Sequence, residues 1–70
     1  MAKTVIDGYT VEVEPGDNGV ECWISKGHYS ASLACAENEG ELADNSSGAT
    51  ISINEATVDR IRQFAERNGY

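Results

Sequence analysis

Basic residues are scarce in this sequence, and long apolar segments are absent from it. Five lysines and arginines stand against twelve aspartates and glutamates, which leaves a net charge of −7. Nucleic-acid binding depends on clustered Lys and Arg side chains, so we expect neither free nucleic acid nor an anionic membrane surface as a direct partner. No window holds the roughly 18 apolar residues that a membrane span needs.

The first residues also lack a basic stretch followed by an apolar run. We therefore expect no signal peptide and a cytoplasmic location, in a cell or for a product of a phage or mobile element made there. The length predicts a single domain, residues 1–70. A domain of this size buries only about 60% of its unfolded surface, so its stability margin is small and a deep substrate cavity is not expected.

The sequence contains four strand patterns. The predicted strands are Thr4–Glu14, Val20–Ser25, His28–Ala36 and Ala49–Ile53. From Tyr9 the first strand alternates apolar with polar side chains, which is typical of a strand with one buried face. Gly8 interrupts it and indicates a bulge. The segment 15–19, Pro-Gly-Asp-Asn-Gly, predicts a turn.

The second and third strands predict a hairpin closed by Lys26-Gly27 as a two-residue loop. The apolar pairs that follow are Ile24 with Tyr29, Cys22 with Ala31 and Val20 with Leu33. All three pairs lie on one face, and polar residues together with Trp23 lie on the other. A slip of one residue would exchange the faces, so the pattern favours this register.

A helix is predicted over residues 55–68. Asn54 is a suitable N-cap, and the apolar stripe of this helix is Val58, Ile61, Phe64 and Ala65. The acidic segment Glu37–Asp44 is expected to be an exposed loop with Leu42 as a hydrophobic plug. The predicted fold is therefore α+β, of order β-β-β-β-α: a small four-stranded antiparallel sheet (a β-meander) with one C-terminal helix packed on one face.

The expected buried face of the sheet packs against Val58, Ile61 and Phe64 of the helix. It consists of Tyr9, Val11, Val13, Val20, Cys22, Ile24, Tyr29, Leu33, Ile51 and Ile53.

The sequence has only two cysteines and one histidine, so few side chains could form a redox or metal site. In the predicted register Cys35 lies four residues beyond the partner of Cys22, about 13 Å away at ~3.3 Å per residue. A disulfide needs Cα atoms within about 7 Å, so we expect two buried, reduced thiols. Together with His28 they lack the spacing of a metal site, so neither a metal nor another cofactor is expected.

No catalytic motif is present either. None of the serines lies in a Gly-x-Ser-x-Gly turn. Ser30, His28 and Glu21 could share a face as a triad, but a flat, exposed sheet excludes water poorly, so we expect no enzyme. A small enzyme or redox protein that uses His28 or the cysteines is kept as an alternative.

The outer face of the sheet is the most informative surface. It is expected to carry Trp23 among acidic side chains, and tryptophan is enriched at binding hot spots. In one allowed register, with Pro15 facing Val20, Glu14 lies opposite Glu21, and like charges directly opposite destabilise a sheet. The predicted partner-binding residues are Glu12, Glu14, Glu21, Trp23, Glu37, Glu39, Glu41 and Asp44. The last four belong to a loop expected to be mobile.

The favoured function is therefore non-enzymatic binding to a basic protein surface. Nucleic-acid-binding proteins are the commonest source of such surfaces. By analogy of size and charge alone, the concrete hypothesis is a small inhibitor that competes with DNA or RNA, as phage anti-CRISPR and DNA-mimic proteins do. The alternative from another class is a homo-oligomeric structural or accessory module, a homodimer for example, whose self-interface uses Trp23 and a sheet edge.

Overall fold

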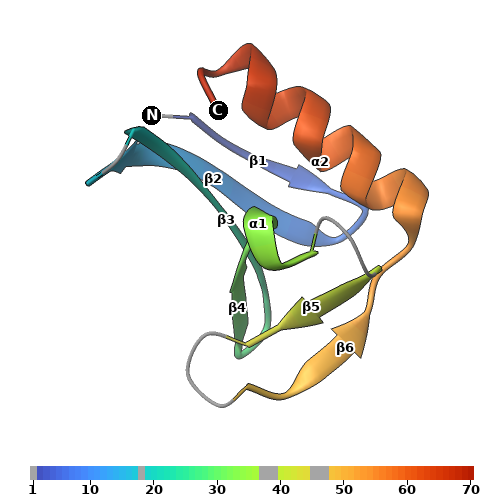
Figure 1. Ribbon diagram of the computed structural model, residues 1–70. Coiled ribbons are helices and arrows are strands. Elements are labelled where there is room, and N and C mark those ends of the chain that lie inside the picture. Colours follow the sequence, from blue (N-terminus) through green and yellow to red (C-terminus); the bar gives the residue numbers. More distant parts are fainter. Residues whose placement is uncertain (1, 18, 37–39, 45–47) are drawn as a thin grey trace.

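The computed structural model describes residues 2–17, 19–36, 40–44 and 48–70. Its elements are β1 (Ala2–Ile6), β2 (Tyr9–Gly16), β3 (Gly19–Lys26), β4 (Tyr29–Ser32), α1 (Leu33–Ala36), β5 (Glu41–Ala43), β6 (Thr50–Ser52) and α2 (Glu55–Arg67) (Figure 1). Strands β1 to β4 form one antiparallel sheet in sequential order, and β5 pairs with β6 in a second sheet. The predicted α+β class, with a four-stranded meander and a C-terminal helix, is confirmed.

The first hairpin was missed in the sequence, where Thr4–Glu14 was expected to be one strand. The chain reverses at Asp7-Gly8, with Ile6 opposite Tyr9. Asp7 has φ 50° and Gly8 has φ 86°, the pair of positive values that a type I′ turn requires. The glycine that indicated a bulge is therefore the second residue of a two-residue turn.

The hairpin of β3 and β4 has a different register from the predicted one. Its loop is Gly27-His28 rather than Lys26-Gly27, and Ile24 faces Ala31. Gly27 has φ 60°, which suits the first position of a tight hairpin turn. The shift amounts to two residues, so each side chain stays on its predicted face.

The predicted third strand, His28–Ala36, is wrong beyond Ser32. There the chain turns into the single-turn helix α1, whose first residue, Leu33, is fully buried. The Ser32 hydroxyl accepts a hydrogen bond from the Ala34 backbone N–H at 3.3 Å, as a helix N-cap does. This turn removes the chain from the sheet and brings Leu33 into the core.

The predicted fourth strand belongs to the second sheet instead of the first. Within Ala49–Ile53 the structure has β6, which pairs with β5 and places Leu42 opposite Ile51. Residues 41–43 were expected to belong to an exposed loop, but they form β5. Residues 37–39 of that predicted loop lie outside the described residues. Leu42 is 1% exposed, so its predicted role as a plug is confirmed.

The core lies on one side of the four-stranded sheet. Its buried apolar side chains are Tyr9, Val11, Val13, Cys22, Ile24, Ala31, Leu33, Leu42, Ile53, Val58, Ile61 and Ala65. Three members of the expected buried face differ: Val20 is 37% exposed near the tip of the β2–β3 hairpin, and Tyr29 and Ile51 are only half-buried. Each fully buried Val, Leu or Ile stabilises the fold by roughly 1.5–3 kcal/mol.

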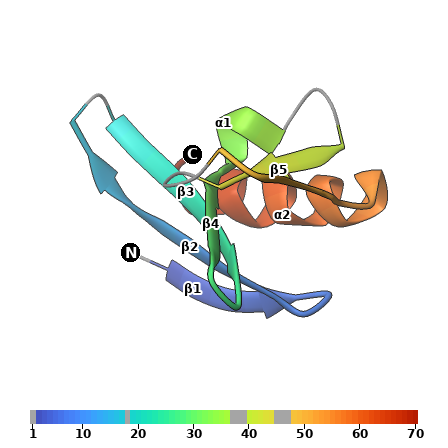
Figure 2. The ribbon, with the colours of Figure 1, turned by 90° about the horizontal axis from the view of Figure 1, so that it is seen from below.

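The C-terminal helix covers this core as predicted. Asn54 is its N-cap, with Oδ1 accepting a hydrogen bond from the Ala56 N–H at 2.8 Å. Figure 2 shows α2, α1 and β5 on the same side of the sheet formed by β1, β2 and β3. The opposite face of that sheet is left uncovered by any described element. Within the described residues, no helix has the length and apolar character to cross a membrane.

One polar cluster ties the β1–β2 turn to the helix. The Thr57 hydroxyl donates to Oδ2 of Asp7 at 2.6 Å, and the Arg60 guanidinium forms an ion pair with the same oxygen. The hydrogen bond from Thr57 and the contact with Arg60 lower the pKa of Asp7 below its usual value of 3.8. The turn therefore contributes a charge-dependent contact between segments that are 50 residues apart.

We expect Asp7→Asn to lower stability at neutral pH. Asparagine tolerates the same positive φ, so the change removes the charge and keeps the turn. A carboxylate with a lowered folded pKa stabilises above its unfolded pKa, near 3.9, and this stabilisation is lost as the pH falls through the folded value. Urea unfolding between neutral pH and about pH 2 should show the wild-type advantage disappearing below about pH 4.

Asp17→Asn is the matched control, because Asp17 is an exposed carboxylate in the β2–β3 turn. Equal effects of the two substitutions at every pH would contradict the role assigned to Asp7.

Candidate functional site

The candidate site is the outer face of the sheet. The strand register places side chains of neighbouring strands next to one another in rows across this face. Glu12, Trp23 and Ser32 lie side by side on β2, β3 and β4. The next row towards the β3–β4 turn consists of Thr10, Ser25 and Ser30. The predicted placement of Trp23 with acidic and hydroxyl side chains on this face agrees with the structure.

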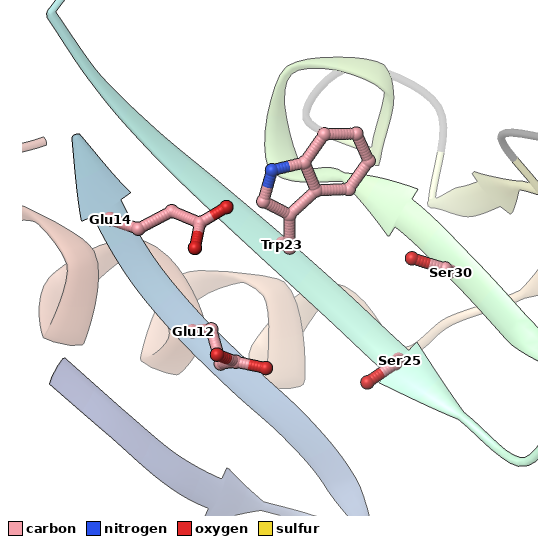
Figure 3. A pocket seen from close by; sticks show the side chains of 5 residues that line it. All are labelled: Glu12, Glu14, Trp23, Ser25 and Ser30. Atoms are coloured by element: carbon pink, nitrogen blue, oxygen red, sulfur yellow. The ribbon is translucent and has the colours of Figure 1, made fainter. Parts of the chain in front are cut away.

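A shallow hollow opens on this face beside the indole (Figure 3). It has a volume of about 290 Å³ and is lined by Glu12, Glu14, Trp23, Ser25 and Ser30. Figure 3 shows the indole standing out from β3, with Glu14 on the side of its ring nitrogen. Ser25 was not among the predicted site residues, although strand alternation from Trp23 places it on this face.

Trp23 is half-buried and held by a neighbour on its own strand. Its ring N–H donates to Oε2 of Glu21 at 3.3 Å. The Glu21 side chain itself lies over Gly16, where an added Cβ would come within 2.5 Å of its Cγ. A side chain at residue 16 would therefore displace Glu21, and the glycine supports the position of the carboxylate that orients the indole.

Like charges meet across β2 and β3. Glu14 lies directly opposite Glu21, and Pro15 opposite Val20, so the register considered from the sequence is confirmed. A carboxylate pair directly across an antiparallel ladder destabilises the sheet. Among the described residues, no lysine or arginine forms an ion pair with either glutamate.

Most basic side chains lie away from this face. Lys26 stands over the Tyr9 ring at 4.8 Å from its centroid, and the helix arginines Arg60 and Arg62 pair with acids outside this face. Lys3 is the one lysine or arginine found on this face within the described residues. Its Nζ lies 4.0 Å from Glu12, with both side chains exposed, so it screens that carboxylate only weakly. The end of the face that carries Glu14 and Glu21 thus remains negative.

The acidic loop expected from the sequence does not join this face as a unit. Asp44 is buried, and its Oδ1 accepts a hydrogen bond from the Ser30 backbone N–H at 3.0 Å. It completes the edge of β4 instead of belonging to a mobile acidic surface. Glu41 is exposed on β5, in the second sheet. Glu37 and Glu39 lie outside the described residues.

The residues considered for catalysis are not brought together. Glu21 lies near the start of β3 and His28 in the turn after its end, so about 20 Å of strand separates them at ~3.3 Å per residue. A triad of Glu21, His28 and Ser30 is therefore excluded by the strand geometry. Within the described part of the chain, no group of three metal-ligating side chains converges.

Cys22 is a core residue on the other face of β3. It is a free thiol with 1% exposure, and burial raises its pKa to about 11. A thiol with that pKa carries almost no thiolate at neutral pH, and the thiolate is the reactive form. Cys22 therefore has the properties of a small apolar core residue.

We expect Cys22 to resist thiol reagents in the folded protein. In a Cys35→Ser background, the remaining thiol should react with an aromatic disulfide reagent at pH 8 only as fast as the domain opens. The same protein in denaturant should react at the rate of a free cysteine. Rapid modification of the native protein would contradict this assignment.

Removal of one member of the facing glutamate pair should stabilise the domain. We expect Glu14→Gln to raise the free energy of unfolding by about 0.2–1 kcal/mol at low salt, because the like-charge contact disappears. Added salt should reduce the gain through screening. Urea unfolding measures this, and Glu12→Gln is the control because Glu12 contacts Lys3. A Glu14→Gln protein no more stable than the control would show that the pair is not repulsive.

No family model matches the chain, and neither a curated protein nor a solved structure matches it. The function considered below therefore rests on the residues of this chain.

Proposed function

We propose that the domain is a non-enzymatic binding module whose outer sheet face docks on a basic protein surface. The observation that carries the proposal is the facing pair Glu14 and Glu21 beside the half-buried indole of Trp23. The fold keeps two carboxylates in a repulsive position on a domain of 70 residues. Cationic side chains of a partner would relieve this repulsion on binding.

The chemistry of the hollow suits lysine or arginine side chains of the partner. A cation over an indole face gains attraction from the ring quadrupole, and the neighbouring carboxylates of Glu12 and Glu14 supply acceptors. Arginine satisfies both requirements, since its planar guanidinium stacks on aromatic rings and donates in pairs to carboxylates. Trp23 would act as the anchor and the glutamates as the charged surroundings.

In its concrete form, the domain is an inhibitor of a nucleic-acid-binding protein in the cytoplasm. Proteins that bind phosphates present clustered lysines and arginines, and a carboxylate-rich sheet can compete for the same cluster. The net charge of −7 would speed the encounter with such a surface. Competition with DNA or RNA is the property that separates this form from simple docking.

The first test is a pull-down from cell lysate with the tagged wild-type protein at low and high salt, followed by mass spectrometry. Recovery of a basic nucleic-acid-binding protein that is lost on adding salt supports the proposal. A competition assay with DNA or RNA then tests the inhibitory form. Recovery of only non-basic proteins, with no effect of salt, would contradict docking through the acidic face.

For a recovered partner, we expect Trp23→Ala to weaken binding by at least ~2 kcal/mol, about thirtyfold in Kd, as loss of a hot-spot tryptophan does. Tyr70→Ala is the matched control, because Tyr70 is a 40% exposed aromatic residue at the C-terminus, outside this face. Calorimetric titration gives both constants. Equal losses for the two variants would remove Trp23 from the interface.

A further inference from the structure

The four-stranded sheet has one occupied edge and one open edge. At the β4 edge, the Ser30 N–H already donates to Asp44, and β5 packs alongside. At the other edge, β1 hydrogen-bonds to β2 alone among the described strands, and α2 contacts β1 from the covered side of the sheet (Figure 2). An edge strand with unpaired backbone groups is a template for pairing with another strand.

The register of the first hairpin identifies the backbone groups that face outward. Ile6 and Tyr9 flank a two-residue loop and therefore form a hydrogen-bonded pair. Such pairs alternate along an antiparallel ladder, so Thr4 bonds to β2 while Lys3 and Val5 direct their N–H and C=O groups outward. Within the described part of the chain, these outward groups form no hydrogen bond.

The side chains of β1 leave this edge accessible. Val5 is 67% exposed, the highest value among the large apolar residues found exposed in the structure. Lysine often protects an edge, but Lys3 leans across the sheet toward Glu12 on β2. The strand carries no acidic residue, although the chain has twelve. It is therefore a segment where two copies of this acidic protein can meet without bringing carboxylates together.

We propose that β1 pairs antiparallel with β1 of a second copy and forms a two-fold dimer centred on Thr4. In this register Lys3 lies opposite Val5 of the second copy, and the converse pair is identical by symmetry. All four outward N–H and C=O groups on each strand then find partners, and Thr4 faces its own copy, a favourable cross-strand pair. The two alternative registers that use these groups place Lys3 opposite Lys3 or leave the Lys3 groups unpaired.

The dimer closes on itself because the β4 edge is occupied. A two-fold interface uses the same patch on both copies, so pairing through β1 alone produces a dimer and not a filament. The two four-stranded sheets then form one continuous eight-stranded sheet, and the outer faces of both copies lie on the same side of it. The proposal does not depend on the function of those faces.

Salt separates this dimer from docking on a basic surface. Two copies of charge −7 repel each other, so screening should strengthen the dimer. The same screening should weaken docking on a basic partner. The two interactions therefore respond to NaCl with opposite signs.

Sedimentation velocity over a concentration series, at low and at high NaCl, tests the proposal. We expect a monomer–dimer equilibrium that shifts toward dimer at high salt. Val5→Lys places like charges opposite each other and should raise the dimer Kd about tenfold or more. Val20→Lys is the matched control, since Val20 is also an exposed strand valine but lies on β3, away from this edge, and it should leave the Kd unchanged.

Val5→Pro gives a second variant that acts on the backbone. It removes an outward N–H and leaves the β1–β2 ladder bonds in place, and far-UV circular dichroism checks that the domain stays folded. A wild-type protein that remains monomeric at both salt concentrations would overturn the proposal. Equal effects of lysine at residues 5 and 20, or loss of the dimer in Trp23→Ala, would likewise overturn it by placing the self-interface elsewhere.

Discussion

Burial of one face of the four-stranded sheet is the constraint on which the rest of the structure depends. Along β2 and β3 successive side chains point to opposite faces, and only one face is covered by α2, α1 and β5. Val11 and Ile24 are fully buried for this reason, while Glu12 and Trp23, their neighbours in sequence, remain on the outer face. A domain this small has no second layer to place over the outer face, so that face is left for solvent or for a partner.

The same period of two explains what the sequence could and could not predict. It identified the buried residues of β2 and β3 and the N-capped helix, but it could not distinguish registers that differ by two residues. The loop at Gly27-His28 was therefore placed one residue too early, with every face still right. Asp-Gly is a characteristic sequence of type I′ turns, so the Asp7-Gly8 turn could have been predicted, but Gly8 was interpreted as a bulge within one continuous strand.

The least predictable elements were the ones that depend on distant contacts. Strand β5 has three residues, too few for a periodic signal, and the strand predicted at Ala49–Ile53 pairs with β5 instead of with the meander. Asp44 was counted with the exposed acids because its partner, the Ser30 amide, lies 14 residues away in sequence. Asp7 likewise acts through Thr57 and Arg60, which sequence spacing could not connect to it. Net charge thus includes carboxylates that support the fold as well as those available to a partner.

The remaining acids on the outer face require a different explanation from the structural ones. Asp7 pairs with the Arg60 guanidinium and Asp44 accepts a hydrogen bond that completes the edge of β4, whereas Glu14 lies opposite a second carboxylate, that of Glu21. A domain with a small stability margin loses free energy through such a pair, and the loss persists as long as both carboxylates are ionised. Gly16 permits this arrangement, since the absence of a side chain there leaves the space in which the Glu21 side chain lies. A cation that bound between Glu14 and Glu21 would relieve their repulsion, and this relief would add to its binding free energy. In a dimer paired through β1, the acidic ends of the two faces would lie on one continuous surface, and a partner with two basic sites could relieve both pairs at once.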